Sequence, residues 1–209
     1  MYKCQALSRC LLLVGCIITI FFMTCIFGCK SDNKEKKAEE ISNQAIGIDE
    51  KSYKELEFLK LNFKYGLENN FAILRNAKVY YGNDTTKIFK ILPLIKKNTL
   101  VFRFSGKICD RCIDMVIKEM QHVFPNYAKT NQIVLLGSEL NPQVKDTFFG
   151  KKVLSYFKNE TIGLAIEKDF VPFMFLTDNN GKVNQLFIVD AEHFDLTKQY
   201  LQSIKSTIQ

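Results

Sequence analysis

The stretch 99-TLVFRFSGKICDRC-112 joins a run of β-branched and aromatic residues to two cysteines that are separated by two residues. Residues 99–104 are typical of a buried strand, and the turn pair Ser105-Gly106 ends it. Beyond Cys112 the apolar residues recur at helical spacing. The sequence therefore predicts that Cys109 and Cys112 lie where a strand passes into a helix.

A pair of cysteines at this position suits thiol–disulfide exchange. A thiolate at a helix N-terminus is stabilised by unpaired backbone N–H groups and by the helix dipole. A second cysteine one turn later can attack the mixed disulfide that the first one forms. Structural disulfides and half-sites for zinc use the same spacing, so the motif alone leaves three interpretations open.

The composition predicts one main folded domain with a modest positive charge. The chain has 209 residues, of which 47% are hydrophobic, and its formal net charge is +7. This length and composition allow one sizeable core with flanking segments. The positive excess is small and lacks an Arg-rich cluster, so nucleic-acid binding is not expected.

The first 28 residues are typical of a secretory signal. A basic start with Lys3 and Arg9 precedes an apolar stretch over 11–27, and this layout also overlaps with that of a short membrane anchor. The end of the stretch, Ile26-Phe27-Gly28-Cys29, resembles the lipobox of bacterial lipoproteins. That resemblance implies that Cys29 is lipidated and becomes the new N-terminus. An uncleaved signal anchor is the alternative.

The seven cysteines leave one pair for redox chemistry. Four of them lie in or beside the signal segment, and Cys29 is consumed if it carries a lipid. Cys109 and Cys112 then remain. This count fits an exported protein with a single dithiol.

The segment between the signal and the core divides into a tether and an extension. Residues 29–50 begin with the lipidated cysteine and are otherwise rich in Lys, Glu, Ser, Asn and Asp, which predicts a flexible tether. Residues 51–98 are predicted to form an N-terminal extension packed on the core. Within it we expect a helix over 51–70, strand material over 71–81 and a further apolar segment over 88–95.

Residues 99–209 are predicted to form the core domain. Turn and periodicity signals place its later elements along the chain: a helix ending at Pro125-Asn126, a strand over 133–136, a helix from Pro142 to about Tyr156, two strands over 170–177 and 183–189 joined by an Asn-Gly turn, and a final helix over 193–204.

This order of elements resembles the thioredoxin fold, and more closely the thioredoxin-like lipoproteins of the Bacteroides group. The resemblance covers residues 99–209 and rests on Cys109-x-x-Cys112 followed by Val171-Pro172. It implies an α/β fold whose central mixed sheet is flanked by helices. It also implies that Cys109 is the exposed nucleophile and that Cys112 resolves the mixed disulfide.

The same resemblance assigns a role to Val171-Pro172. In this family the proline that faces the dithiol is cis, and the backbone beside it pairs with an extended substrate segment. Val171 and Pro172 are therefore expected to bind substrate. An ordinary trans proline at a strand edge is the alternative.

Two residues depart from the family pattern. Ile108 stands where an aromatic residue is common, and Arg103 stands where many members have a buried acid. If Arg103 points towards the sulfurs, it favours the thiolate. An arginine that faces solvent is the other possibility.

The leading hypothesis is an envelope-tethered thiol–disulfide oxidoreductase that acts on protein disulfides. Its partners would be client proteins, a redox partner protein and the membrane that holds the lipid, with the domain in the periplasm or on the outer surface. No cofactor or metal is expected, because there is no second Cys-x-x-Cys motif and no histidine fixed near the pair. His122 and His193 are interpreted as surface or packing residues.

Three other functions fit the sequence less well. A binding or structural lipoprotein of the same fold, with an inert Cys109–Cys112 disulfide, is the main alternative. A peroxidase is disfavoured because the peroxiredoxin family has Thr three residues before its reactive cysteine, where this chain has Gly106. A metal-binding role is disfavoured for the reasons given above.

Overall fold

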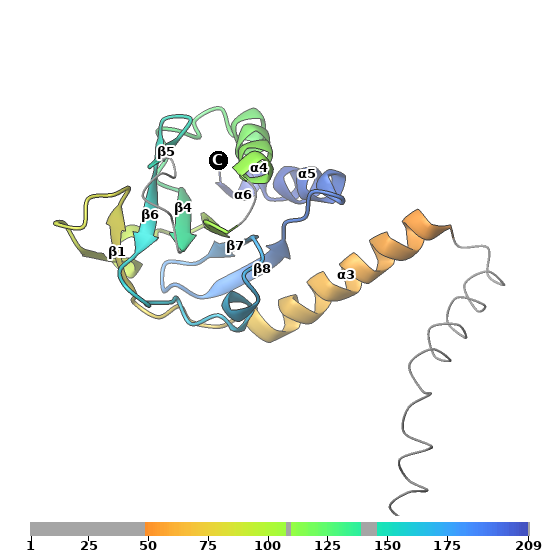
Figure 1. Cartoon of the computed structure of the whole chain (residues 1–209), viewed down its shortest axis with the longest axis horizontal. Coiled ribbons are helices and arrows are strands. Elements are labelled where there is room, and N and C mark those ends of the chain that lie inside the picture. The colour runs from red at the N-terminus through yellow and green to blue at the C-terminus, as the bar shows by residue number, and fades with distance from the viewer. Residues whose placement is uncertain (1–48, 108–109, 139–145, 209) are drawn as a thin grey trace, which may run out of the picture. The chain divides into compact units, whose positions relative to one another are not determined.

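The computed structural model describes residues 49–107, 110–138 and 146–208 (Figure 1). The predicted signal peptide, the lipidated Cys29, the tether up to residue 48 and the predicted nucleophile Cys109 lie outside these residues. The chain divides into two compact units, Met1–Lys54 and Glu55–Gln209. In the first unit the description begins at Asp49, whose carboxylate caps the following helix by accepting from the Ser52 backbone N–H at 2.8 Å.

One mixed sheet organises the unit Glu55–Gln209, with the strand order β2-β1-β6-β4-β3-β7-β8 and β5 paired to β6. The bounds of the strands are β1 Lys78–Tyr81, β2 Phe89–Lys90, β3 Thr99–Ser105, β4 Ile133–Ser138, β5 Thr147–Phe148, β6 Lys151–Tyr156, β7 Phe173–Thr177 and β8 Val183–Ile188. The helices are α3 Glu50–Asn69, α4 Asp110–Val123, α5 Phe194–Ser203 and α6 Lys205–Ile208, with 3-10 turns η1 Leu92–Leu94 and η2 Ala165–Asp169.

Strand β3 is the centre of this sheet. It pairs in parallel with β4 and antiparallel with β7, and all seven of its residues are buried. Because side chains alternate along a strand, Phe102 and Phe104 enter the core beneath α4 and α5. Val101 belongs to a second core on the opposite face. A strand that is buried on both faces needs apolar or aromatic residues at nearly every position, as the sequence of β3 has.

The connections around β3 identify the fold. Helix α4 follows β3 and leads to its parallel neighbour β4, whereas β7 and β8 form an antiparallel hairpin on the other side of β3. Helix α5 then returns to the face that α4 covers (Figure 1). The fold is α/β and thioredoxin-like. The predicted fold class is confirmed.

Helix α3 and Asn70, the residue that follows it, cover the free edge of β8, and the helix lies within one residue of the predicted bounds 51–70. The Asn62 Oδ1 atom accepts from the Ile188 backbone N–H at 2.7 Å, and Asn70 Oδ1 accepts from that of Leu186 at 3.1 Å. Further along β8, the backbone N–H of Phe71 donates to the carbonyl of Val183 at 2.7 Å. These hydrogen bonds satisfy groups that an open edge strand would leave exposed for pairing with another chain.

The helix predicted from Pro142 to about Tyr156 is wrong. Residues 139–145 are not described, and the chain then forms the short hairpin β5–β6, with Phe149 and Gly150 both at positive φ in its turn. Strand β6 lies between β4 and β1, where both of its faces are covered, so Val153 and Leu154 are both buried. A short apolar run of this kind has no clear period, and the spacing of its apolar residues was read as helical.

The remaining elements follow the sequence more closely. The hairpin β7–β8 and helix α5 lie where they were predicted, although β7 begins at Phe173, after the proline. In the segment 71–81, for which a strand was predicted, only Lys78–Tyr81 forms one, strand β1. The apolar segment over 88–95 forms the two-residue strand β2 and the turn η1.

Tyr65 fastens α3 to η2 by donating a hydrogen bond to the Asp169 carboxylate. This hydrogen bond, together with burial, raises the pKa of Tyr65 from 10.0 to about 12. The stabilisation from the bond is therefore complete below pH about 10 and is lost as the pH rises towards 12. We predict that Tyr65→Phe lowers the free energy of unfolding by about 1 kcal/mol at neutral pH.

Two measurements check this prediction. Denaturant unfolding at pH 7 measures the free energy of unfolding. Absorbance of tyrosinate at 295 nm follows ionisation of the tyrosines, and the titration curve of wild type minus that of Tyr65→Phe should show one phenol that titrates near pH 12. Tyr81→Phe is the matched control, because that hydroxyl makes no hydrogen bond within the described part of the chain. Equal stability of wild type and Tyr65→Phe would contradict the assignment.

Candidate functional site

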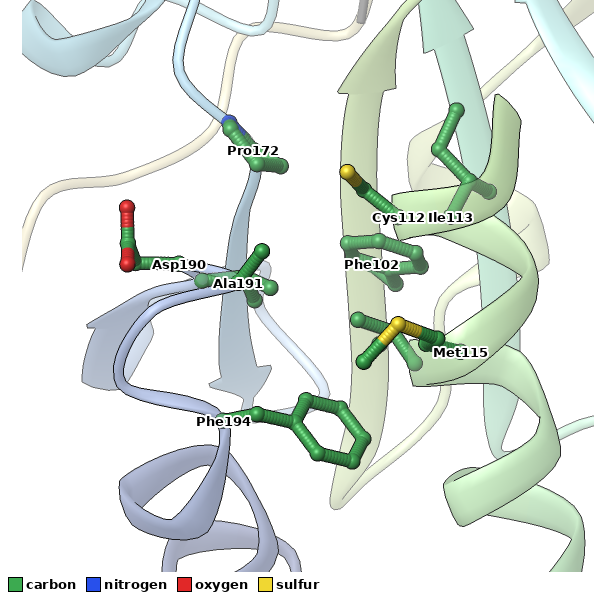
Figure 2. A pocket seen from close by; sticks show the side chains of 10 residues that line it. Phe102, Cys112, Ile113, Met115, Pro172, Asp190, Ala191 and Phe194 are labelled. Atoms are coloured by element: carbon green, nitrogen blue, oxygen red, sulfur yellow. The ribbon is translucent and has the colours of Figure 1, made fainter. Parts of the chain in front are cut away.

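Cys112 and Pro172 line one cavity next to the central strand (Figure 2). Cys112 lies in the first turn of α4, and Pro172 immediately precedes β7. Because β3 leads into α4 and pairs with β7, it brings these two distant segments to the same end of the sheet. The cavity is lined by one thiol, one carboxylate and a set of apolar side chains: Phe102, Cys112, Ile113, Met115, Val116, Pro172, Val189, Asp190, Ala191 and Phe194.

The Cys112 side chain is half-buried and opens into this cavity. Figure 2 shows its sulfur directed away from α4, with Pro172 and Asp190 on the opposite wall. The cavity has a volume of about 190 Å³, which exceeds the roughly 150 Å³ that holds a benzene-sized ligand in a protein interior. One apolar side chain of a bound segment therefore fits beside the sulfur.

Pro172 is trans, because the described residues contain no cis peptide bond. The cis geometry implied by the family resemblance is therefore not seen, and the structure has the strand-edge trans proline that was the alternative. The Pro172 carbonyl accepts from the Val189 backbone N–H at 2.9 Å, which extends the β7–β8 pairing by one step. Val171 is partly buried against the core on the other face of the sheet and does not line the cavity.

Asp190 is the one carboxylate among the residues that line the cavity, and the sequence analysis did not single it out. Its Oδ1 atom accepts from the backbone N–H groups of Glu192 at 2.7 Å and His193 at 3.1 Å, and it lies 3.1 Å from His193 Nδ1. Its Oδ2 atom accepts no hydrogen bond from the described residues. The Oδ1 atom is therefore fixed by the turn that follows β8, and the Oδ2 atom remains able to accept a proton or a hydrogen bond.

His193 is a packing residue, as expected, and it also contacts Asp190. Its ring stacks on Phe58 of α3 with centroids 4.5 Å apart and an angle of 2° between the planes. Together with the contact to Asp190, this stack links the cavity wall to the extension. The sequence did carry a signal for Asp190 and His193, because the motif Asp-x-x-His directly follows the predicted strand over 183–189. In a β-hairpin the end of the second strand lies next to the start of the first, so this motif lies near the start of β7 and Pro172.

Arg103 occupies neither of the two positions considered for it. Its side chain is 3% exposed and lies on the opposite face of the sheet from the cavity, with Cζ 5.6 Å from the centroid of the Phe173 ring. Its Nε and Nη1 atoms are buried without a hydrogen-bond partner among the described residues. The guanidinium charge therefore does not face the Cys112 side of β3.

Glu167 and Tyr156 are hydrogen-bonded to each other on the same side of the sheet as Arg103. Glu167 accepts a hydrogen bond from the Tyr156 hydroxyl at 2.6 Å and from two backbone N–H groups, those of Gly163 and Leu164. Burial raises the pKa of Tyr156 well above its ordinary value, the Glu167 charge adds to this rise, and the charge of Arg103 opposes it. The Arg103 charge thus acts on the buried Tyr156–Glu167 pair and not on the cavity.

A different cation, Lys107, lies two residues before Cys109 in the sequence. The Lys107 ammonium lies 4.7 Å from the centroid of the Phe170 ring. This contact joins the segment that precedes Cys109 to the loop that carries Pro172. A lysine two residues from Cys109 supplies the kind of positive charge that stabilises a thiolate.

Comparison with known proteins supplies no closer assignment. No protein-family model and no curated protein matches the chain. An uncharacterized thioredoxin-like protein from Porphyromonas gingivalis shares 18% identity at a TM-score of 0.42, covering 65% of this chain and 95% of that one. The mitochondrial 2-Cys peroxiredoxin of Plasmodium falciparum shares 15% identity at a TM-score of 0.39, covering 65% of this chain and 92% of that one.

A candidate thiol:disulfide interchange protein DsbE from Chlorobium tepidum gives 14% identity and a TM-score of 0.38 over 65% of this chain and 99% of that one. With scores this low, the fold assignment rests on the order and direction of the strands. Among the described residues, no group of three or more His, Cys, Asp or Glu side chains is placed to hold a metal ion. No helix in the described ranges is long and apolar enough to cross a membrane.

Proposed function

We propose that this chain is an envelope-tethered thiol–disulfide oxidoreductase that acts on protein disulfides through Cys109 and Cys112. The observation that supports it most is the placement of Cys112 in the first turn of α4, with its sulfur opening into an apolar cavity opposite Pro172. A structural disulfide has no need of an adjoining cavity. An enzyme that must place a substrate sulfur beside its own cysteines does.

The reaction transfers two electrons to the substrate. The Cys109 thiolate attacks one sulfur of a substrate disulfide, so a Cys109–substrate bond forms and the other substrate sulfur leaves as a thiolate. Cys112 then loses its proton and attacks the Cys109 sulfur, which forms the Cys109–Cys112 disulfide and releases the second substrate thiolate. A redox partner protein returns the pair to the dithiol by the reverse exchange.

Substrate binding would use the cavity and the backbone around Val171 and Pro172. An extended segment lying along this loop places one apolar side chain against Met115 and Phe194 on the cavity wall. Main-chain pairing beside Val171 would set the register of that segment, and the cavity would select its side chain. Clients are therefore proteins with an apolar residue near an accessible disulfide.

Asp190 would take the proton from Cys112 in the second step. Burial in an apolar cavity favours the neutral thiol, so the attack of Cys112 needs a proton acceptor. Asp190 faces the thiol across the cavity, and it is the only ionisable group besides Cys112 among the described residues that line the cavity. Water in the cavity can carry the proton between them, because the cavity volume exceeds that of several water molecules.

The location and lineage are proposed from the sequence. The basic and apolar segment 1–28 followed by Cys29 supports export and lipidation, and residues 30–48 supply a spacer between lipid and domain. The protein would then be held at the membrane with its domain in the periplasm or on the outer surface. The likeness to lipoproteins of the Bacteroides group stands on the same residues and on the order of the two motifs.

One observation favours the alternative of an inert bridge in a binding or structural lipoprotein. Cys112 is only half-exposed, and apolar surroundings resist formation of its thiolate. In that case the cavity would bind an apolar group, and no thiol–disulfide exchange would take place there. The two functions differ in the reactivity of Cys109.

Single cysteine variants separate these functions. We predict that Cys112→Ser accumulates a mixed disulfide between Cys109 and a client or a model disulfide, because the resolving thiol is missing. Cys109→Ser should accumulate little, since the nucleophile is lost. Non-reducing electrophoresis and mass spectrometry after acid quenching measure the adducts. Equal, negligible trapping by both variants would contradict the oxidoreductase.

The role of Asp190 can be measured with 5,5′-dithiobis(2-nitrobenzoate) and the reduced chain. The first thionitrobenzoate released reports attack by Cys109, and the second reports displacement by Cys112. We predict that Asp190→Asn leaves the first phase unchanged and slows the second roughly 10–100-fold, because Asn keeps the hydrogen bonds of Oδ1 but accepts no proton.

Asp195→Asn is the matched control, because this exposed carboxylate lies on the first turn of α5 outside the cavity. The slowing by Asp190→Asn should lessen as the pH rises and Cys112 ionises unaided. An Asp190→Asn second phase as fast as that of wild type at pH 7 would refute the proton-acceptor role.

A further inference from the structure

Helix α3 has a second apolar face that is turned away from the domain core and is largely exposed. One face of the helix, with Phe58, Asn62, Tyr65 and Asn69, packs on the domain. A different stripe of the helix, at spacings of three and four residues, is exposed, and two further exposed apolar residues, Phe71 and Ile73, follow the end of the helix. Its members and their exposed fractions are Leu56 43%, Leu59 44%, Phe63 69%, Leu67 69%, Phe71 69% and Ile73 70%. We refer to these six residues as the outer stripe.

The outer stripe is too large to be an ordinary surface feature. If each large apolar side chain offers roughly 200 Å² when fully exposed, the stripe exposes roughly 700 Å². The largest apolar patch on a typical monomer is roughly 300–600 Å² and is often functional. A stable interface buries about 800 Å² on each partner. The stripe thus supplies most of the area that one side of a dimer needs.

The charges around the stripe favour a protein partner over a lipid surface. Helix α3 contains four lysines and four glutamates, so its net charge is zero. Interfacial helices that bind anionic membranes are rich in Lys and Arg on the polar face. Mixed signs beside an apolar stripe are instead typical of helices that pair with other helices.

The stripe also suits pairing with itself. Phe63 lies at its centre within the helix, with Leu59 four residues before and Leu67 four residues after. In an antiparallel pair related by a twofold axis at Phe63, Leu59 of one copy faces Leu67 of the other, and each Phe63 meets its equivalent. The edge of β8 is already covered by α3, so sheet pairing does not compete with helix pairing at this side.

We propose that two copies of this chain associate through the outer stripe of α3, in antiparallel orientation about Phe63. The cavity with Cys112 and Pro172 shares no residue with the stripe, so each copy keeps its own site. Because both copies would be held at one membrane, their association is helped by a high local concentration. This inference does not depend on the proposed redox chemistry.

The test uses two differently tagged full-length chains, coexpressed and solubilised in detergent. The wild-type chains should copurify, and Phe63→Lys/Leu67→Lys in both copies should reduce the recovered partner about tenfold or more, because it places charges at the centre of the interface. Leu61→Lys is the matched control: Leu61 is 40% exposed on the same helix but lies outside the stripe. Undiminished copurification of the double variant would overturn the proposal.

A second measurement does not depend on introducing charge. The chain contains no Trp, so Phe63→Trp provides a single fluorescent reporter at the predicted axis. Its emission should be blue-shifted at high protein concentration and should shift to the red on dilution. Emission that is red at every concentration overturns the proposal. If it turns blue only when phosphatidylglycerol vesicles are added, the occupant of the stripe is the membrane instead.

Discussion

The pairing of β3 with both β4 and β7 is the constraint on which the rest of the structure depends. All seven residues of β3 are buried, so the strand can exist only when both faces and both edges are covered. Its parallel edge requires a crossover, which α4 supplies, and its antiparallel edge receives the β7–β8 hairpin. This pairing brings the first turn of α4 next to the loop before β7, and residues of both segments line one cavity.

The sheet also separates two kinds of electrostatic environment. On the α4 side, an apolar cavity contains one thiol and one carboxylate, with Lys107 contributing positive charge at the adjoining loop. On the other side, Tyr156 is hydrogen-bonded to the buried Glu167, and the charges of Glu167 and Arg103 act on the pKa of Tyr156 in opposite directions. Arg103 therefore lies on the face of the sheet opposite the cavity and makes no direct contact with Cys112.

Much of this arrangement could be predicted from the sequence, because its signals are local. The β3 run, the helical period after Cys112 and the Asn-Gly turn between β7 and β8 each depend on residues close together in the chain. The hairpin β5–β6 could not, since a strand buried on both faces has no readable period. The asparagine contacts of Asn62 and Asn70 with β8, the trans geometry of Pro172, the placement of Asp190 and the burial of Arg103 depend on tertiary neighbours.

The central claim is that Cys109 and Cys112 form a reversible redox pair. The most direct measurement equilibrates the chain with graded ratios of reduced and oxidised glutathione, traps the free thiols by alkylation and counts them by mass spectrometry. The account predicts that both cysteines convert together in one transition, with a tenfold change in equilibrium constant for about 30 mV. A pair that stays oxidised at every ratio and under mild dithiothreitol would contradict it and leave the cavity as a binding site alone.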